Sequence, residues 1–282
     1  MYTLLDFGNG RRLERFGPLL LDRPCPTAER MPKRNPPAWN SADVVFLEER
    51  NSFERGRWTP KTECGRNLSE PWPVDFGDLT LELRATPFGH VGVFPEQAEN
   101  RARIRTLLTE AAAHRSTPIR VLNLFAYTGG STLAAASAAE NIEVVHVDAA
   151  KNILAWAKRN AELNGLQNAN IRWIAEDAQK FVRRELKRNN RYNAVILDPP
   201  SYGHGPGGEV WTLTEHLPGL LNDLLRLIET DPLFLLLTAH TPNVDLAAMF
   251  PSGVETTKTA MFLQAETGER LPAGTAILRL RF

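Results

Sequence analysis

The second part of the chain alternates short apolar runs with segments of helical spacing, and this alternation constrains the fold more than any other feature. The apolar runs are residues 120–126, 143–148, 171–177, 192–200 and 232–240. Near-continuous apolar strands separated by helices are typical of a parallel sheet with crossover helices on both faces. We therefore expect an α/β fold: a doubly wound, mostly parallel, Rossmann-like sheet. The helices are expected at 131–139, 150–164, 178–188 and 213–229.

Two strand-like segments end the chain, at 254–264 and 274–282, with a short turn containing glycine and proline between them. A short turn joins antiparallel strands, whereas parallel strands need a long crossover. We expect a C-terminal antiparallel hairpin at the end of the sheet.

The first part of the chain lacks this alternation of strands and helices. Residues 1–95 contain short strand-like stretches interrupted by proline and glycine, which predicts a smaller β-rich N-terminal domain with a possible role in substrate recognition. Residues 30–72 carry many prolines and charges and are expected to be loop-rich. Helical spacing then predicts a connector helix within 96–117, so the α/β domain is expected to occupy 118–282.

Composition excludes several classes of protein. The chain has 33 Lys and Arg and 33 Asp and Glu, so no overall basic field attracts nucleic acid. RNA contacts would have to come from local clusters, either on the N-terminal part or on the helix at 178–188. The residues of these clusters are Arg11, Arg12, Arg15, Arg183, Arg184, Lys187 and Arg188.

The longest apolar run, 232–237, is too short to cross a bilayer, and no signal-peptide pattern opens the chain. We expect a cytoplasmic protein without membrane contact. Cys25 and Cys64 are the only cysteines and provide neither a disulfide framework nor a zinc site, so no metal is expected.

The ends of the predicted strands carry the residues of a candidate cofactor site, because open α/β sheets bind ligands at the carboxyl ends of their strands. After the first strand, Gly129 and Gly130 allow the backbone to approach a ligand closely. Asp148 ends the second strand 19 residues beyond Gly129, near the spacing of about 20 at which a carboxylate meets ribose hydroxyls. Asp177, followed by Ala178, ends the third and can accept from an adenine amino group.

Each of these residues also has a purely structural interpretation. The glycines can form an ordinary turn, and Asp148 can cap the helix that follows it. A nicotinamide-dependent dehydrogenase shares the architecture, but Tyr127 and Thr128 stand where its G-x-G-x-x-G motif needs glycine. The coincidence of acidic residues at three strand ends favours a cofactor that contains ribose and adenine but no pyrophosphate.

These segments resemble a known family. Residues 125–130 (FAYTGG), 147–160, 163–166 and 197–200 (LDPP) are similar to the RlmI/RlmK-like branch of class I S-adenosylmethionine (SAM) dependent methyltransferases, which methylate 23S ribosomal RNA. The resemblance also covers 92–97 with Asn100 and Arg101, a segment that in the family helps close the cofactor pocket. The family's N-terminal RNA-binding PUA domain is not evident here.

The resemblance implies a SAM-dependent methyltransferase with RNA as its partner. It implies that the turn after the first strand, with Gly130 at its end, wraps the methionine part of SAM, that Asp148 binds the ribose, and that Asp177 and Ala178 lie at the adenine. It implies Asp198 beside the reacting methyl group. The residues of the turn are Phe125, Tyr127, Thr128 and Gly129.

The type of acceptor atom follows from what the sequence lacks. Methylation of a pyrimidine carbon needs a cysteine nucleophile, and neither 198–201 nor 235–241 contains one. We therefore expect non-covalent transfer to a ring or exocyclic nitrogen, with an oxygen as the alternative acceptor. Asp198 and the Pro199 carbonyl would accept from the N–H group of such a nitrogen, and Tyr202 would stack on the base. The alternative for Tyr202 is packing against the sheet.

The glycine-rich segment 203–209 follows this site and is predicted to act as a lid. His204 and Glu209 are either proton-transfer groups or solvated loop residues. His90 either faces the pocket or is structural. Two functional alternatives stay open: a methyltransferase acting on a small molecule or protein, and a non-catalytic SAM-binding module.

Overall fold

The computed structural model describes residues 1–49, 52–205, 207–208, 210–228, 230–241 and 244–280. The chain forms two compact units. The N-terminal unit consists of Met1–Glu96 and Phe262–Ala273, and the α/β unit consists of Gln97–Met261 and Gly274–Phe282. Residues 262–273 therefore return to the N-terminal unit. The boundaries expected from the sequence, at residues 95 and 118, do not include this return.

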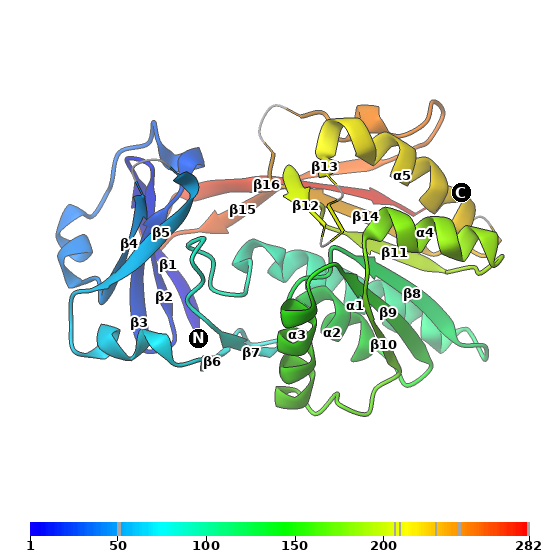
Figure 1. The fold of residues 1–282 in the computed structure, drawn as a ribbon, viewed down its shortest axis with the longest axis horizontal. Coiled ribbons are helices and arrows are strands. Elements are labelled where there is room, and N and C mark those ends of the chain that lie inside the picture. The colour runs from blue at the N-terminus through cyan, green and yellow to red at the C-terminus, as the bar shows by residue number, and fades with distance from the viewer. Residues whose placement is uncertain (50–51, 206, 209, 229, 242–243, 281–282) are drawn as a thin grey trace. The chain divides into compact units, whose positions relative to one another are not determined.

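The α/β unit is built on a seven-stranded sheet with the order β10-β9-β8-β11-β14-β16-β15 (Figure 1). Neighbouring strands from β10 to β14 are parallel, and β16 is antiparallel to β14. This confirms the doubly wound sheet and its C-terminal hairpin. The strands are β8 (Ile119–Leu124), β9 (Ile142–Asp148), β10 (Ile171–Ala175), β11 (Ala194–Leu197), β14 (Phe234–Ala239), β15 (Thr257–Gln264) and β16 (Arg270–Arg279).

Helices cover both faces of this sheet because alternate residues of the buried strands point to opposite sides. In β11, Val195 and Leu197 pack with helices α4 and α5, whereas Ala194 and Ile196 pack with helix α1. The expected helices are present within a few residues at each end. They are α1 (Ala98–Ala113), α2 (Gly130–Ala136), α3 (Lys151–Leu163), α4 (Ala178–Lys187) and α5 (Leu213–Ile228).

Strand order reverses at β8, which pairs with β9 on one side and β11 on the other. The connections that follow β8 and β11 therefore leave in opposite directions, and open sheets of this kind bind ligands at the carboxyl ends of such strands. The residues after Leu124, Val147 and Leu197 lie along this edge, where the sequence predicts the cofactor site. Within the described ranges, no helix is long and apolar enough to span a bilayer.

The N-terminal unit contains a five-stranded sheet in the order β1-β2-β3-β4-β5, in which only β3 and β4 are parallel. A separate hairpin pairs β6 with β7. The bounds are β1 (Tyr2–Gly8), β2 (Arg11–Phe16), β3 (Leu19–Pro24), β4 (Val44–Glu49), β5 (Ser52–Pro60), β6 (Trp72–Asp75) and β7 (Thr80–Leu83). Leu4, Phe7, Leu263 and Leu271 share one core, which ties the returning segment to this unit.

The expectation that 30–72 is loop-rich is wrong for 44–49 and 52–60, where β4 and β5 form an antiparallel pair. Val44 and Phe46 are buried, but Leu47, Glu48 and Glu49 are exposed, so the apolar alternation covers only half of β4. A strand whose second half faces solvent with charged residues leaves a weak hydrophobic pattern.

Candidate functional site

The turn between β8 and α2 has an unusual backbone. Phe125 and Tyr127 adopt left-handed conformations (φ 53° and 48°), and Gly129 (φ 94°) is the N-cap of α2. A Cβ on Gly129 would lie 3.3 Å from the Ala157 Cβ. Left-handed non-glycine residues cost energy and persist where the surroundings determine them. The turn, residues 125–129, thus has a fixed backbone conformation that places the start of α2 at the carboxyl end of β8. We call this turn the cradle.

Helix α3 stabilises the cradle through a side-chain hydrogen bond. The buried Asn160 of α3 donates from Nδ2 to the carbonyl of Thr128 at 2.9 Å. Thr128 is itself buried, and Gly130 begins α2. A Cβ on Gly130 would make only ordinary contact, 3.6 Å from the Arg101 side chain. The left-handed backbone and the close Ala157 therefore both favour glycine at 129, whereas neither applies at 130.

Asp148, at the end of β9, also stabilises the cradle. Its Oδ2 accepts from the amide of Tyr127 (2.9 Å) and its Oδ1 from the amide of Ala150 (3.0 Å). Burial raises the pKa of Asp148, and these two amides oppose the rise. The N-cap of α3 is Ala150, without a side-chain bond, so Asp148 does not cap α3. Each carboxylate oxygen keeps a lone pair, which fits a ribose with two vicinal hydroxyls.

Asp177 has a structural role that the sequence analysis did not assign to it. It is the N-cap of α4, and its Oδ1 accepts from the amide of Lys180 at 2.9 Å. Ala178, the first helical residue, is buried. A carboxylate with one oxygen in a cap bond retains its second oxygen for an amino group, so the cap is compatible with an adenine contact.

Asp198, directly after β11, is the centre of a hydrogen-bonded network. Its Oδ2 accepts from Gln97 Nε2 (3.0 Å), and its Oδ1 accepts from the Thr238 hydroxyl (2.7 Å). Asn100 in turn donates to Gln97 Oε1 at 2.8 Å. His240 places Nε2 3.8 Å from Asp198 Oδ1. The side chain of Asp198 is 28% exposed, so a polar, partly open site lies at the end of β11.

Sequence reasoning assigned no role to Thr238 and His240. Both lie at the carboxyl end of β14, which pairs in parallel with β11. The run 232–240 signalled a strand, but its position beside β11 depends on strand order, which the sequence does not display. Gln97 lies in the segment that the family resemblance indicated.

The Asp-Pro-Pro turn is held by a hydrogen bond from Trp211 and is followed by Tyr202. Pro199 is buried, and the Pro200 carbonyl accepts from the Trp211 indole N–H at 2.7 Å. Tyr202 is 52% exposed, and its hydroxyl hydrogen-bonds His204 Nε2 at 3.1 Å. Tyr202 therefore does not pack against the sheet, and its ring is accessible to a planar ligand.

The segment predicted to act as a lid begins within a β-strand. Strand β12 (Tyr202–His204) pairs with β13 (Val210–Thr212) in an antiparallel hairpin. Gly203 and His204 are thus part of a ladder, and Glu209 lies outside the described residues. His90 belongs to the N-terminal unit, where it is exposed and meets the Phe94 ring edge-on.

The structure corrects part of the predicted basic clusters. Arg11 pairs with Asp22 (2.5 Å) and donates to the Phe46 carbonyl, while Arg12 lies 3.1 Å from the fully buried Glu14. Both guanidinium groups are used inside the N-terminal unit because they neutralise acidic groups there. Only Arg15 of this cluster is exposed.

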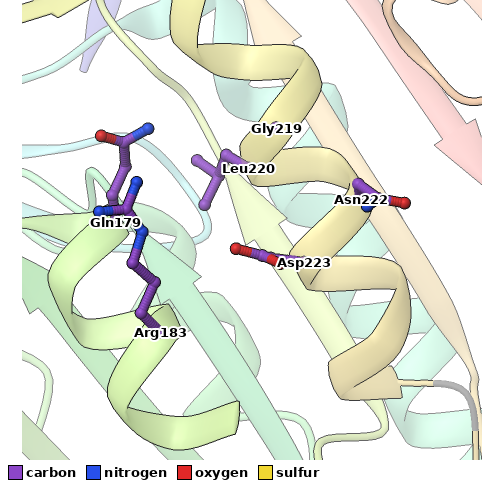
Figure 2. Close-up of a pocket in the computed structure, with 6 residues that line it drawn as sticks. All are labelled: Gln179, Arg183, Gly219, Leu220, Asn222 and Asp223. Carbon is purple, nitrogen blue, oxygen red and sulfur yellow. The ribbon is translucent and has the colours of Figure 1, made fainter. Parts of the chain in front are cut away.

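On α4, Arg184 pairs with Glu176 at 2.6 Å, whereas Arg183, Lys187 and Arg188 are exposed. A groove between α4 and α5 lies beside this face, with Arg183 and Asp223 on opposite walls (Figure 2). None of the predicted cofactor residues lines the groove, so it is separate from the strand-end site.

Comparison with known proteins agrees with this geometry. The family model for S-adenosylmethionine-dependent methyltransferases matches residues 37–242. Ribosomal RNA large subunit methyltransferase I of Aeromonas hydrophila is 36% identical over 139 residues, 49% of this chain and 33% of that protein. Methyltransferase K/L of Magnetococcus marinus is 30% identical over 155 residues, 54% of this chain and 20% of that protein. The matches thus span a third or less of these curated relatives.

Solved structures extend the similarity to the whole chain. The SAM-dependent methyltransferase from Agrobacterium tumefaciens is 34% identical with a TM-score of 0.87, covering 99% of this chain and 90% of that one. SMU.776, a methyltransferase crystallised with S-adenosylhomocysteine, shares the fold at a TM-score of 0.74 and 16% identity, covering 99% of this chain and 75% of that one. With its cradle, its strand-end aspartates and these matches, the chain belongs to the family of SAM-dependent methyltransferases.

Proposed function

We propose that this protein methylates a base nitrogen of large-subunit ribosomal RNA by direct, non-covalent transfer. The observation that carries the proposal is the Asp198 carboxylate, held by Gln97 and Thr238 and followed by two prolines and the exposed ring of Tyr202. The names of the curated relatives support RNA as the substrate class.

The cofactor is SAM, which supplies an electrophilic methyl group on a sulfonium. We assign its ribose to Asp148 and its adenine to Asp177 with Ala178. Asp198 faces the methyl donor's reactive end. The turn that ends at Gly130 holds the methionine part, and its residues are Phe125, Tyr127, Thr128 and Gly129.

Positioning supplies most of the rate in this scheme, since methyl transfer needs an aligned nucleophile. Gln97 and Thr238 fix both oxygens of Asp198, and the remaining lone pairs accept from the N–H group of the base. The Pro199 carbonyl is the second acceptor, and Tyr202 stacks on a base that has been splayed out of its helix.

The α/β unit contains no cysteine, since Cys25 and Cys64 both lie in the N-terminal unit. A thiolate attack on a pyrimidine ring therefore has no nucleophile in the unit that carries Asp198. We assign substrate recognition to the β-rich part that precedes residue 96, methyl transfer to 118–282, and the protein's place of action to the cytoplasm.

The proposal is tested by incubating enzyme and methyl-labelled SAM with three samples in parallel: an unmodified 23S RNA transcript, large ribosomal subunits, and a metabolite and protein extract. We expect label in RNA, and nucleoside mass spectrometry should place it on a base nitrogen. Label in small molecules or protein alone would favour the competing substrate class. SAM binding without transfer to any sample would favour a non-catalytic module.

A further inference from the structure

The side chain of Trp211, in β13, contacts two turns of the candidate site. Its indole N–H donates to the carbonyl of Pro200, in the Asp-Pro-Pro turn, at 2.7 Å. Its ring meets the ring of Phe125, the first residue of the cradle, with the two centroids 4.8 Å apart. Trp211 is buried. The proposed function gives a role to each of the two turns but none to the indole that joins them.

The hairpin of β12 and β13 directs this indole toward the Asp-Pro-Pro turn. Trp211 lies opposite Gly203, and Tyr202 lies opposite Thr212. Opposite residues of an antiparallel pair share a face, and successive residues alternate between the two faces. Tyr202 is exposed on one face, so Trp211 points to the other face, where it is buried. One hairpin therefore exposes the Tyr202 ring and anchors the turn that precedes it.

Neighbouring groups limit the movement of the indole. The ring of His216, from α5, stacks on it with the centroids 5.7 Å apart and the planes 28° from parallel. His216 Nδ1 in turn accepts from the amide of Thr212 at 3.0 Å. The Leu213 amide donates to the Ser201 carbonyl at 3.0 Å and closes the base of the hairpin. The hydrogen bond to Pro200 therefore comes from a donor whose position is fixed.

We propose that Trp211 is a positioning residue of the methyl transfer. The inference rests on the proposed function, in which the Asp-Pro-Pro turn holds the acceptor base and the cradle holds the methionine part of SAM. The indole N–H bonds the first of these turns and the indole ring packs against the second, so one side chain sets the distance between them. Trp211 acts through Pro200 and Phe125 and not on the reacting atoms.

The backbone of the Asp-Pro-Pro turn has few degrees of freedom once this bond is made. The pyrrolidine rings of Pro199 and Pro200 fix φ at both residues, which leaves ψ as the soft angle. A hydrogen bond to the Pro200 carbonyl fixes the orientation of its peptide group and hence ψ of Pro200. The donor on Trp211 thus removes a rotation that would otherwise move the acceptor base relative to the cofactor.

Methyl transfer is sensitive to such a rotation. The acceptor nitrogen, the methyl carbon and the sulfur must lie in line, and a misplacement of about 1 Å can lower a rate about 100-fold. A tryptophan that only fills space would instead respond to a loss of ring area and not to the loss of one N–H group. Removal of the donor alone therefore distinguishes positioning from packing.

The test is single-turnover methylation of unmodified 23S RNA transcript at saturating SAM, with calorimetry of SAM binding on the same preparations. Trp211→Phe keeps a ring against Phe125 but has no donor for Pro200. It should lower the rate between about 10-fold and 100-fold and leave the Kd for SAM within about twofold of wild type. Trp211→Leu also removes the ring contact with the cradle, so it should weaken SAM binding by at least about threefold.

Trp173→Phe is the matched control, because it makes the same change in the same unit. Trp173 lies in β10, where its ring meets that of the buried His146. This variant should keep the wild-type rate and SAM affinity. Urea denaturation of each variant shows that it is folded at the assay temperature.

Three results would overturn the inference and leave the proposed function intact. The first is a Trp211→Phe rate within about twofold of wild type, and the second is an equal loss of rate in Trp173→Phe. The third is a Trp211→Phe protein that does not fold, which would make Trp211 a core residue. If wild type transfers no label to RNA, the proposed function fails instead, and this inference with it.

Discussion

The backbone amide of Tyr127 donates to Asp148 Oδ2 at 2.9 Å, so the left-handed turn after β8 is fastened to the end of β9. One carboxylate therefore shapes the cradle, and in the assignment proposed above its remaining lone pairs accept from the ribose of SAM. Loss of this side chain removes both contributions.

Asp148→Ala should weaken SAM binding by at least about 1.5 kcal/mol, because hydrogen bonds to a charged acceptor are worth that much. Isothermal calorimetry with SAM and S-adenosylhomocysteine measures the change. Asp245→Ala is the matched control, since Asp245 is exposed, accepts from the Ala247 amide at 3.3 Å and lies 3.4 Å from Lys258 Nζ, away from the strand-end aspartates. Equal affinities for the two variants would contradict the ribose assignment.

Asp198→Ala should abolish methyl transfer and leave SAM affinity nearly unchanged. The reason is that Asp198 is assigned to the acceptor base, whereas the cradle and Asp148 hold the cofactor. Single-turnover rates and calorimetry on the same preparation separate the two quantities. A parallel loss of SAM binding would place Asp198 in cofactor binding instead.

A Cys25→Ser, Cys64→Ser double variant should keep most of the activity. Cys25 is buried in the N-terminal unit and Cys64 is exposed there, and neither is expected to attack a base. RNA containing 5-fluorocytidine traps enzymes that do form a covalent adduct. An adduct with wild type that disappears in the double variant would show a cysteine-dependent mechanism.

The buried His146 should make stability depend on pH. Its Nδ1 hydrogen-bonds the Thr132 hydroxyl at 2.8 Å, and desolvation lowers its pKa from 6.5 to about 3. Because the folded state holds the neutral ring, only the unfolded chain binds a proton between these values, and stability falls as pH drops below 6.5. From pH 7.5 to 5 the loss from this group is about 2 kcal/mol.

Urea denaturation of wild type and His146→Gln at the two pH values measures this effect. Glutamine is polar but does not titrate, so the variant should lose about 2 kcal/mol less on acidification. The same pH dependence in both proteins would mean that the ring is protonated in the folded state.

Gly129→Ala should destabilise the protein more than Gly165→Ala. Both glycines are left-handed (φ 94° and 68°), which costs an alanine about 1 kcal/mol. Only at Gly129 would the new Cβ lie close to another residue, 3.3 Å from Ala157 Cβ, while at Gly165 no atom lies within 4 Å. The difference in the free energy of unfolding between the two variants, measured by chemical denaturation, isolates the packing cost at Gly129. Equal losses of stability would show that α3 shifts to make room for the new Cβ.

The sequence predicts those site residues whose position depends only on the strand that they follow. Asp148 and Asp198 end apolar runs, and the ends of parallel strands share an edge, so their common location followed directly. His240 also ends such a run, but its proximity to Asp198 depends on β14 lying next to β11. That pairing is a tertiary property, and no local pattern encodes it.

Other differences have local causes. The sequence analysis treated Asp177 only as a ligand group, and the bond from the Lys180 amide shows that it also caps a helix. Strand β4 was missed because Leu47 and the two glutamates after it face solvent and break the alternation. The role of Arg11 was misjudged because its partner Asp22 comes from β3, whose pairing with β2 the sequence does not display. The partner of Arg12 is Glu14, two residues along the same strand, and the burial of Glu14 was not foreseen.

The C-terminal hairpin has a practical consequence for anyone who wishes to study the halves of this protein separately. Leu263 and Leu271 are packed with Leu4 and Phe7, and the Glu266 amide donates to the Leu4 carbonyl at 2.9 Å. A fragment that starts at residue 97 would carry these leucines without their partners and would tend to aggregate. Excision of the N-terminal unit thus takes two cuts, with 262–273 replaced by a short polar turn.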